Sequence, residues 1–555
     1  MAVVYMKKLE QEPSSYDSQF TILTKGINLK VQDWILDKLN KPSSILEIGC
    51  GTGILASKMA SKGNKVIAID SNFQMINHAM QNYPSELNQD NLLYQIGTFT
   101  DMPVEEKTQD LIVSTFMLSE LRPFEQQIFL RNAWKTLKPD GRVIIAAEFL
   151  PKGFWKIFFQ LKRWRYRKKL RRLRLKSTFL IKWFFNYIEA IGFKILNREK
   201  WKRGSIQVLE LQKINENESN EPGYYRPKSL NFRGIISQLK IYRCTLTGQV
   251  DHVPIEPGIY QSGNPDSNSP IIVTANYQFT FIKVMRDIKD IDAWVLVVDS
   301  NGINVWCAAR GPDFGNDQLL EAVEATDIKY LTSKKTMILP QLSAGGVSTP
   351  ELPQKTEKFP FNVVFGPVWS KDLPKYLQDR PGRKPDYMKL AKFTITHRLR
   401  AFITHTSFLI RKIFIYPLIA LTLLFLILML FNQSLTLSWV GEIAMTIILS
   451  NFLIAVFFPL SKFTRRFILK GTFLGITNTI IIGGLLFFLH NSVPYLLWNS
   501  SFIFWVTFFS TMSFSGYSMA SSPREIQAEY SLFSLLNKIL LGIGIITLSI
   551  GIFFI

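Results

Sequence analysis

Ile45-Leu46-Glu47-Ile48-Gly49-Cys50-Gly51-Thr52-Gly53 is the stretch that decides the fold of the N-terminal domain. An apolar run leads into three glycines at alternate positions, and a helical pattern follows, so we expect a strand, a tight turn and the start of a helix. The next apolar run ends in Asp70, about 20 residues further on, where a carboxylate can accept hydrogen bonds from both ribose hydroxyls. Together these features predict a doubly wound fold that binds an adenosine-containing cofactor.

Short apolar runs and helical patterns alternate from about residue 25 to residue 215. This alternation predicts a mostly parallel sheet covered by helices on both faces, which is a Rossmann-like α/β fold. A polar segment with Pro and Gly, residues 215–227, follows as a linker, and a second alternating block predicts a smaller α/β domain. We therefore expect α/β domains at 1–214 and 228–400, followed by a membrane domain at 401–555.

Five apolar segments follow the second α/β block, and each meets the length of about 20 residues needed to cross a bilayer core. They lie at 408–431, 437–460, 467–489, 495–517 and 532–555. Buried helices of a soluble domain are the alternative, and the scarcity of charged residues across five consecutive segments argues against it. The expected fold class is therefore α/β combined with a five-helix transmembrane domain.

Lysine and arginine gather on alternate sides of these segments. Five of them lie between residues 392 and 412 and four between 462 and 470, whereas the loops at 432–438 and 490–495 have none. This positive-inside bias predicts a multi-pass protein of the inner (cytoplasmic) membrane with both α/β domains in the cytoplasm and Ile555 outside. Residues 1–15 lack an apolar core of signal-peptide length, so no secretory signal is expected.

The glycine-rich stretch ILEIGCGTG resembles the class I S-adenosylmethionine (SAM) methyltransferases, specifically their small-molecule branch, over about residues 25–215. The resemblance implies that SAM is a cofactor, that Asp70 binds its ribose and that Met75 packs near its adenine. The residues expected on the methionine and ribose side are Glu47, Gly49, Gly51 and Gly53.

One position departs from that family pattern. An acid commonly follows the glycine after the third strand and holds the adenine amino group, whereas Thr98 follows Gly97 here, and Asp101 is a candidate substitute. At the acceptor end no acid–base pair stands out, and Ser119 and Glu120 are the candidates. The methyl acceptor of this domain is not predicted.

A strongly basic insertion at 152–185 has aromatic residues interleaved with its lysines and arginines. An aromatic–basic helix is expected to lie on anionic headgroups, which makes membrane lipid an expected partner. A solvated helix face and a nucleic-acid surface are the alternatives. The apolar segments make the membrane the more economical interpretation, so no nucleic-acid partner is expected.

A second candidate site lies at residues 299–309, directly after the apolar run AWVLVV. Gly302 allows a tight turn, and Asn304 is a favourable N-cap that places Cys307 at the third position of a helix. A helix N-terminus lowers the pKa of a thiol and favours the thiolate. Ala308 and Ala309 are small, so a flat ligand could approach them. Taken alone, however, such a cysteine is more often inert core.

The motif INVWCAA, residues 303–309, is similar to the cap helix of the mercury-methylation corrinoid proteins, whose corrinoid domain is related to the corrinoid iron–sulfur proteins of acetyl-CoA synthesis. The resemblance covers about residues 225–555, including a membrane domain of five spans. Further stretches resemble this family in its order: PGIYQSGNP, PIIVTANYQFTF, FGNDQLLEAV, MILPQLSAGGV, VVFGPV and SMASSPRE.

This resemblance implies a bound corrinoid of cobalamin type, with the Cys307 thiolate as the lower axial ligand of its cobalt. An anionic sulfur donor would push electron density towards a methyl group on cobalt and favour its transfer to a soft electrophile such as Hg(II). A ferredoxin-like iron–sulfur partner is expected to supply electrons. The residues expected against the corrinoid are Thr274, Asn276, Asn304, Trp306, Ala308, Ala309 and Gln341.

Two features separate this chain from that family. The family continues after the two alanines with Gly-Lys-Gly, whereas Arg310-Gly311-Pro312-Asp313 stands here, and Pro312 is expected to end the cap helix. The family protein also usually lacks the SAM domain. Three functions are therefore weighed: corrinoid-dependent methylation of Hg(II) with a fused SAM methyltransferase, a divergent corrinoid/SAM methyltransferase with a non-mercury acceptor, and a membrane sensor or transporter.

Composition limits other chemistry. The three cysteines include no CxxC pair, so neither an iron–sulfur cluster nor a structural zinc is expected, and no disulfide framework is possible in a chain suited to a reducing compartment. A net charge of +22 together with a hydrophobic fraction of 47% is unusual for a soluble enzyme. Both values fit a chain at the anionic face of a membrane.

Overall fold

The computed structural model describes most of the chain, and contacts divide it into two compact units. One is formed mainly by Met1–Pro227 and the other mainly by residues from Lys228 onward. The described residues are 6–84, 91–151, 153–172, 178, 181–214, 228–229, 253–353, 358–378, 384–410, 433–464, 466–490 and 493–512, with single residues and pairs between 239 and 247.

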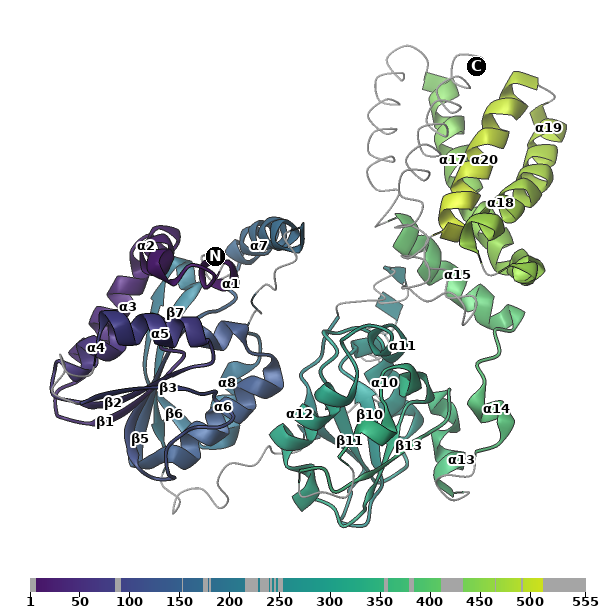
Figure 1. The fold of residues 1–555 in the computed structure, drawn as a ribbon. Coiled ribbons are helices and arrows are strands. Elements are labelled where there is room, and N and C mark those ends of the chain that lie inside the picture. The colour runs from purple at the N-terminus through teal and green to yellow at the C-terminus, as the bar shows by residue number, and fades with distance from the viewer. Residues whose placement is uncertain are drawn as a thin grey trace. The chain divides into compact units, whose positions relative to one another are not determined.

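The first unit is built on a seven-stranded sheet, counted over its described residues, in the order β3-β2-β1-β4-β5-β7-β6 (Figure 1). Strands β1 to β5 pair in parallel, and β7 is antiparallel to both β5 and β6. The predicted mostly parallel sheet is confirmed, while the antiparallel pair at its edge was not predicted. The strands are β1 (Ser44–Ile48), β2 (Lys65–Asp70), β3 (Leu92–Ile96), β4 (Gln109–Thr115), β5 (Leu137–Glu148), β6 (Phe193–Trp201) and β7 (Ile206–Lys213).

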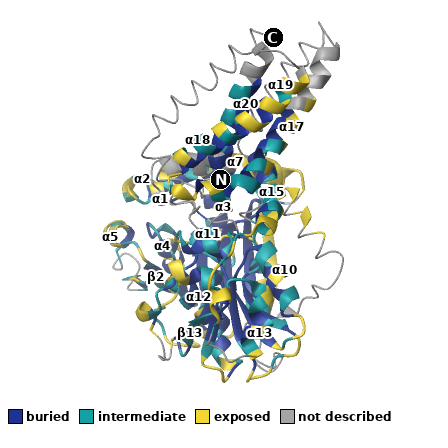
Figure 2. Ribbon diagram, turned by 90° about the vertical axis from the view of Figure 1, so that its right-hand side faces the viewer, coloured by how far each residue is buried: buried dark blue, intermediate teal, exposed yellow. Residues whose placement is uncertain are grey.

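Helices cover both faces of this sheet because its central strand is apolar on both sides. Ile45 packs with Val31 on one face, whereas Leu46 packs with Phe129 on the other, as expected where successive side chains of a strand alternate. Figure 2 shows the strands as buried and many outer helix faces as exposed. The helices are α1 (Met6–Leu9), α2 (Pro13–Thr24), α3 (Ile27–Asp37), α4 (Ile54–Ala60), α5 (Phe73–Asn82), α6 (Pro123–Thr136), α7 (Trp155–Arg172) and α8 (Phe184–Ile191).

The second unit contains a six-stranded sheet, again counted over described residues, in the order β13-β12-β10-β11-β9-β8. The four apolar runs of the second block form β10 to β13, which pair in parallel as predicted. The strands are β8 (Lys228–Ser229), β9 (Gly258–Ser262), β10 (Ile271–Ala275), β11 (Ala293–Val298), β12 (Thr336–Leu339) and β13 (Asn362–Phe365).

Helices of the second unit follow the strands and then lead towards the apolar region. Helix α15 (Ile395–Leu409) runs across residue 400, where the sequence placed the domain boundary. The helices before it are α10 (Gln278–Asp287), α11 (Val305–Ala309), α12 (Asn316–Thr326), α13 (Leu373–Gln378) and α14 (Asp386–Lys389). Those after it are α17 (Gln433–Phe457), α18 (Phe467–Asn478), α19 (Gly484–His490) and α20 (Val493–Met512).

The expected five membrane spans are only partly seen. In the described part of the chain, two helical stretches, Ile443–Phe463 and Phe467–Leu489, are long and apolar enough to cross a membrane. They coincide with the second and third predicted segments. Helix α20 covers most of the fourth segment but is not one of these two stretches. Nearly all of the first segment and all of the fifth lie outside the described residues.

Polar side chains join the described helices of this region to one another. Asn478 on α18 donates hydrogen bonds from Nδ2 to the Ser450 carbonyl of α17 at 3.0 Å and to Thr507 Oγ1 of α20 at 3.1 Å. Such bonds hold helices together where apolar surroundings give no hydrophobic driving force between them.

Candidate functional site

The loop after β1 needs glycine at two positions for steric reasons. Gly49 and Gly53 have φ of +76° and +81°, and a Cβ would lie 2.7 Å from Met117 Cβ at the first and 2.7 Å from Tyr94 Oη at the second. Gly51 also has positive φ, but a Cβ there would meet nothing within 4 Å. Gly51 lines a cavity, so the loop leaves open space at the point where a ligand atom could approach the backbone.

Asp70, at the end of β2, fastens this loop. Its Oδ2 accepts a hydrogen bond from the Gly51 amide at 3.0 Å, and its Oδ1 accepts one from the Asn72 amide at 2.8 Å. Asn72 is the N-cap of α5 and accepts from the Gln74 amide. A carboxylate has about four lone-pair sites, so Asp70 keeps acceptor capacity for a ribose hydroxyl while it orders the loop.

Glu47 is a buried carboxylate on the wall of the same cavity. Its Oε2 has no hydrogen-bond partner among the described residues. Burial raises its pKa well above the usual range, and the nearby Asp70 carboxylate adds to the rise. Buried polar atoms are nearly always hydrogen-bonded, so this oxygen fits a donor supplied by a ligand, such as a hydroxyl or an amino group.

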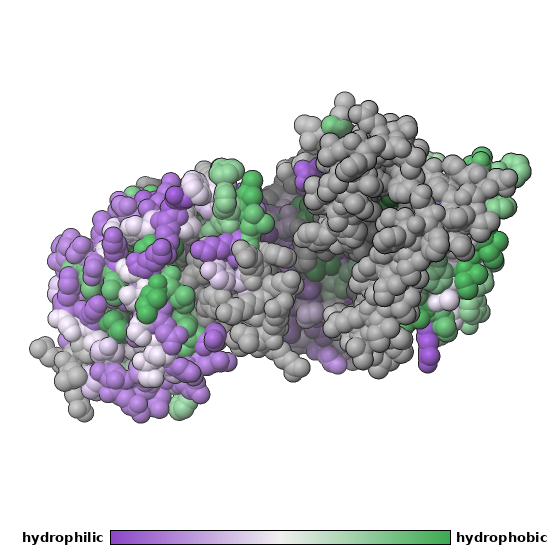
Figure 3. Space-filling model, turned by 90° about the horizontal axis from the view of Figure 1, so that it is seen from above, coloured by the Kyte–Doolittle hydropathy of each residue, from purple (hydrophilic) through white to green (hydrophobic). Residues whose placement is uncertain are grey.

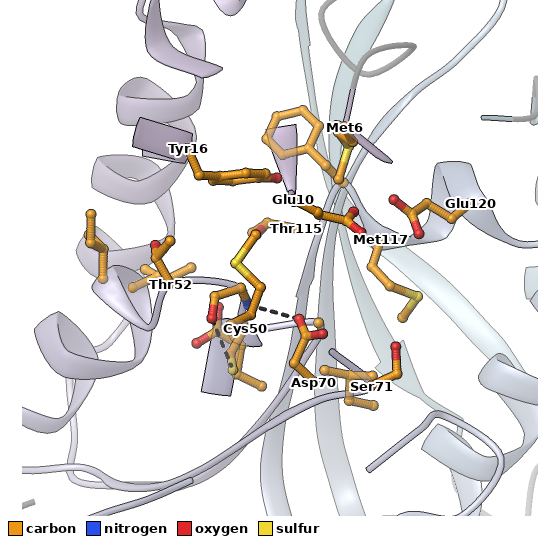
Figure 4. Close-up of a pocket in the computed structure, with 18 of the residues that line it drawn as sticks. Met6, Glu10, Tyr16, Cys50, Thr52, Asp70, Ser71, Thr115, Met117 and Glu120 are labelled. Carbon is orange, nitrogen blue, oxygen red and sulfur yellow. Dashed lines mark hydrogen bonds between the residues drawn. The ribbon is translucent and has the colours of Figure 1, made fainter. Parts of the chain in front are cut away.

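The N-terminal helices form part of the cavity, which sequence reasoning missed. Met6 and Glu10 of the first helical turns and Tyr16 of α2 line it, and Figure 4 shows them across the cavity from Asp70. Burial raises the pKa of Tyr16, and the Glu10 and Glu120 carboxylates raise it further. The cavity measures about 180 Å³. Its acidic lining suits a cofactor that carries positive charge on sulfur and nitrogen, as SAM does.

The remaining predicted residues of this site divide into two groups. Met75 is buried and lines the cavity. Thr98 and Glu120 also line the cavity. Asp101 is exposed and is absent from the cavity lining among the described residues, so the idea that it replaces the missing acid is wrong. Ser119 is also outside the lining, and its Oγ accepts from the Glu148 amide at 3.2 Å.

The cap helix of the second unit has the geometry that the sequence predicted. Asn304 is the N-cap of α11, and its Oδ1 accepts from the Cys307 amide at 3.0 Å. Its Nδ2 also donates to Cys307 Sγ at 3.4 Å, a contact that favours negative charge on sulfur. The helix ends at Ala309 with Arg310 as its C-cap, before Pro312. Cys307 itself is partly exposed.

Asn276, at the end of β10, shapes the loop that leads into this helix. Its Oδ1 accepts from the amides of Ser300 and Gly302, both at 2.9 Å, and its Nδ2 donates to Asp299 Oδ1 at 2.7 Å. It is fully buried. The structure therefore gives Asn276 a positioning role behind the helix, in place of the ligand contact that the sequence suggested.

Another loop packs closely against the end of α11, at Ala309. Ala308 and Ala309 are both buried, and a Cβ on Gly346 would lie 2.5 Å from the Ala309 carbonyl oxygen and 2.8 Å from its Cα. They therefore face the protein interior, so a flat ligand cannot lie on them as expected. Gln341 begins the turn before Gly346, and its Oε1 accepts from Lys384 Nζ, a contact that the sequence did not reveal.

A cavity of about 520 Å³ borders the cap helix. Thr274, Asn304 and Trp306 form one side, and Trp369 and His397, whose rings stack with centroids 4.9 Å apart, are on its lining too. Thr274 Oγ1 is buried and has no hydrogen-bond partner in the described part of the chain, so this wall fits a polar ligand group. The predicted residues that do not line it, among those described, are Cys307, Asn276, Ala308, Ala309 and Gln341.

Comparison with known proteins identifies the class of the first unit. Residues 45–141 match the family "Methyltransferase domain", so this unit carries a methyltransferase domain. Among solved structures, it resembles a putative sarcosine dimethylglycine methyltransferase from Galdieria sulphuraria, with 14% identity over 35% of this chain and 88% of that one and a TM-score of 0.29. A SAM-dependent methyltransferase from Methanosarcina mazei is 22% identical over 33% and 97%, with a TM-score of 0.27. Likenesses at these scores carry no further argument.

The second unit has a different match. Residues 228–354 match the family "CO dehydrogenase/acetyl-CoA synthase delta subunit". The acetyl-CoA decarbonylase/synthase complex subunit gamma of Methanopyrus kandleri is 31% identical over 138 residues, which are 24% of this chain and 29% of that one. The same subunit of Methanocaldococcus jannaschii is 34% identical over 19% and 22%. The chain thus carries a domain of the corrinoid iron–sulfur protein type, and it spans less than a third of the length of these relatives.

Proposed function

We propose that this protein transfers methyl groups through a corrinoid held by its second unit, at the cytoplasmic face of a membrane, with inorganic Hg(II) as the acceptor. The observation that carries the proposal is the contact between Asn304 and Cys307, which presents a partly exposed, hydrogen-bonded sulfur on a cap helix in a domain of corrinoid-protein type.

The residues present fit a corrinoid in two respects. The cavity beside the cap helix is lined by aromatic and aliphatic side chains that suit the macrocycle, and the buried Thr274 hydroxyl can pair with one of its amide groups. When bound, a corrinoid supplies a cobalt centre that can carry and release a methyl group. Thr274 and Trp306 line the cavity and would hold it. Cys307 follows Trp306 on α11 but does not line the cavity, so a macrocycle held there would extend beyond the cavity for the sulfur to reach the metal.

Asn304 prepares that sulfur through two contacts. By capping the helix it places the Cys307 amide and the helix N-terminus next to the thiol, and by donating to Sγ it favours the thiolate. Behind it, Asn276 fixes the loop from Asp299 to Gly302 and so fixes the direction of the helix. A thiolate held in this way is a soft, anionic metal ligand.

A non-mercury acceptor is the second candidate, and one observation favours it. The Arg310 guanidinium lies 5.2 Å from the Trp306 ring centroid, so the residue that departs from the mercury-methylation pattern stands over a residue of the cavity wall. A cation moved to that wall favours anionic acceptors. An assay of methylmercury formation decides between Hg(II) and a small anionic acceptor.

The experiment is a methyl-transfer assay with purified full-length protein, methylcobalamin as the methyl donor, Hg(II) as the acceptor and a low-potential reductant. Methylmercury should form with wild-type protein and fall to background with Cys307→Ala, while Arg310→Lys retains it. If the wild-type protein and Arg310→Lys both form no methylmercury although cobalamin binds to them, the assignment of Hg(II) as the acceptor is wrong. The named relatives are subunits of a complex, and on that basis we also propose a ferredoxin-like electron donor as a partner.

A further inference from the structure

Helix α7 and Phe154, the residue before it, turn large apolar side chains towards solvent. The residues concerned, with their exposed fractions, are Phe154 (67%), Trp155 (42%), Ile157 (56%), Phe158 (53%) and Leu161 (55%). The three aromatic rings contact one another, with centroids 5.1 to 6.2 Å apart, so the group forms one continuous apolar patch. Figure 3 shows apolar surface on the upper face of the first unit. Single exposed apolar residues are common, but a cluster of this size marks an interaction surface.

The opposite face of the same helix is fixed to the sheet. Arg163 is buried, and its guanidinium donates to Glu148 Oε2 at 2.7 Å and to Thr178 Oγ1 at 2.9 Å. Glu148 is the last residue of β5 and is fully buried. Removing one partner of such a pair leaves an uncompensated buried charge, so α7 cannot rotate to bury its apolar patch without a large penalty.

Cations surround the patch. The Arg203 guanidinium lies 3.3 Å from the Trp155 ring centroid, and Lys156 and Lys162 are exposed on α7 itself. Burial lowers the pKa of Lys202, and the nearby charge of Lys25 lowers it further. No Asp or Glu occurs from residue 149 to residue 188. The region around the patch therefore carries an excess of positive charge, which an anionic partner would neutralise.

We infer that this face of α7, the five apolar residues with the surrounding lysines and arginine, docks on an anionic phospholipid bilayer. A bilayer interface takes up both parts of the surface, because acyl chains accept the aliphatic and aromatic side chains while phosphates neutralise the cations. A nucleic acid would match the charge, but it offers no environment for exposed Ile157 and Leu161. Two helical stretches elsewhere in the described part of the chain are also long and apolar enough to cross a membrane.

Docking has a consequence for the methyltransferase domain. Glu148, which anchors α7, ends its strand at the same edge of the sheet as the glycine loop and Asp70, because β1, β2, β4 and β5 run in parallel. The edge that carries the cofactor cavity is therefore the edge that α7 holds to the bilayer. The methyl acceptor of this domain would then be met at the membrane interface.

The test measures whether position 158 enters the bilayer. Full-length protein carrying Phe158→Cys, with Cys50, Cys244 and Cys307 replaced by alanine or serine, is labelled with a fluorophore and reconstituted into vesicles that contain brominated lipids. The matched control is Phe73→Cys, an aromatic position on α5 of the same unit that is 64% exposed, against 53% for Phe158. Because Cys307 is absent from both proteins, the outcome is independent of the corrinoid proposal.

With phosphatidylglycerol in the vesicles, the label at 158 should be quenched several-fold more strongly than the label at 73, and phosphatidylcholine alone or high salt should remove most of the difference. Adding Lys156→Glu and Lys162→Glu to the labelled protein should have the same effect. Equal quenching at the two positions overturns the proposal, as does quenching at 158 that is indifferent to lipid charge, salt and charge reversal. A label at 158 that responds to added RNA and not to lipid overturns it as well.

Discussion

Replacing Asp70 by alanine should weaken SAM binding through two routes. The carboxylate is the expected acceptor for the ribose, and it also accepts hydrogen bonds from the Gly51 and Asn72 amides, which hold the glycine loop and the start of α5. Alanine removes both acceptors at once. The backbone of the loop would remain, but the Gly51 amide at the cavity wall and the Asn72 amide at the start of α5 would lose their partner.

The magnitude follows from these contacts. A donor left without its partner in a buried site costs about 1–3 kcal/mol, and part of that cost is recovered when water reaches the half-buried loop. Loss of the ribose contact adds to it. We expect a loss of about 1–3 kcal/mol in binding, which corresponds to a 5- to 150-fold higher Kd for SAM.

Calorimetric titration of the purified protein with SAM measures this change directly. Asp101→Ala is the matched control, because Asp101 is an exposed acid of the same unit outside the cavity lining, and its removal should leave the Kd unchanged. An unchanged Kd in Asp70→Ala would refute the assignment of the cavity to SAM. A loss of equal size in both variants would show that the effect is general electrostatics and not a contact.

Four further predictions follow from individual residues. Because the pKa of Glu47 is raised, its carboxyl is protonated in the free protein at any pH below that pKa, and a cationic ligand displaces the proton. SAM affinity should therefore rise with pH up to that pKa, and Glu47→Gln should remove the rise. If calorimetry at several pH values finds the same rise of affinity with pH in the variant, Glu47 is not its source. Asn304→Ala should cost about 0.5–2 kcal/mol of cap stability and reduce cobalamin affinity, seen as faster hydrogen exchange in α11, and unchanged exchange would count against the cap. Gly346→Ala should displace α11 and weaken cobalamin binding, because its Cβ would overlap the Ala309 backbone, and full binding would show that the helix tolerates the shift. A reporter fused after Ile555 should be active only outside the cytoplasm, and activity inside would mean an even number of spans.

The sequence predicted the central strands of both sheets because each is a short apolar run bounded by polar or glycine positions. It also predicted the Asn304 cap, since capping depends on residues three apart. These features are local. The edge pair β6–β7 was not predicted, because exposed residues of β6 hide its strand character.

The sequence did not predict contacts between segments that are far apart along the chain. Tyr16 and Glu10 reach the cofactor cavity from helices that precede the first strand, and no local pattern connects them with the glycine loop. Ala309 looked like a ligand surface, whereas it is buried and its backbone packs against Gly346, which is distant in the sequence. Asp101 is near in sequence to the adenine end of the site but is turned to solvent.

The most direct test of the central claim is the absorption spectrum of the purified full-length protein with added cobalamin, recorded for wild type and for Cys307→Ala. Alanine is a good helix former and the thiol is small, so the fold of the domain should survive the change. The account predicts a spectrum with sulfur-to-cobalt absorption in the wild type that is lost in Cys307→Ala. Identical spectra for the two proteins, or no retention of cobalamin by the wild type, would contradict it.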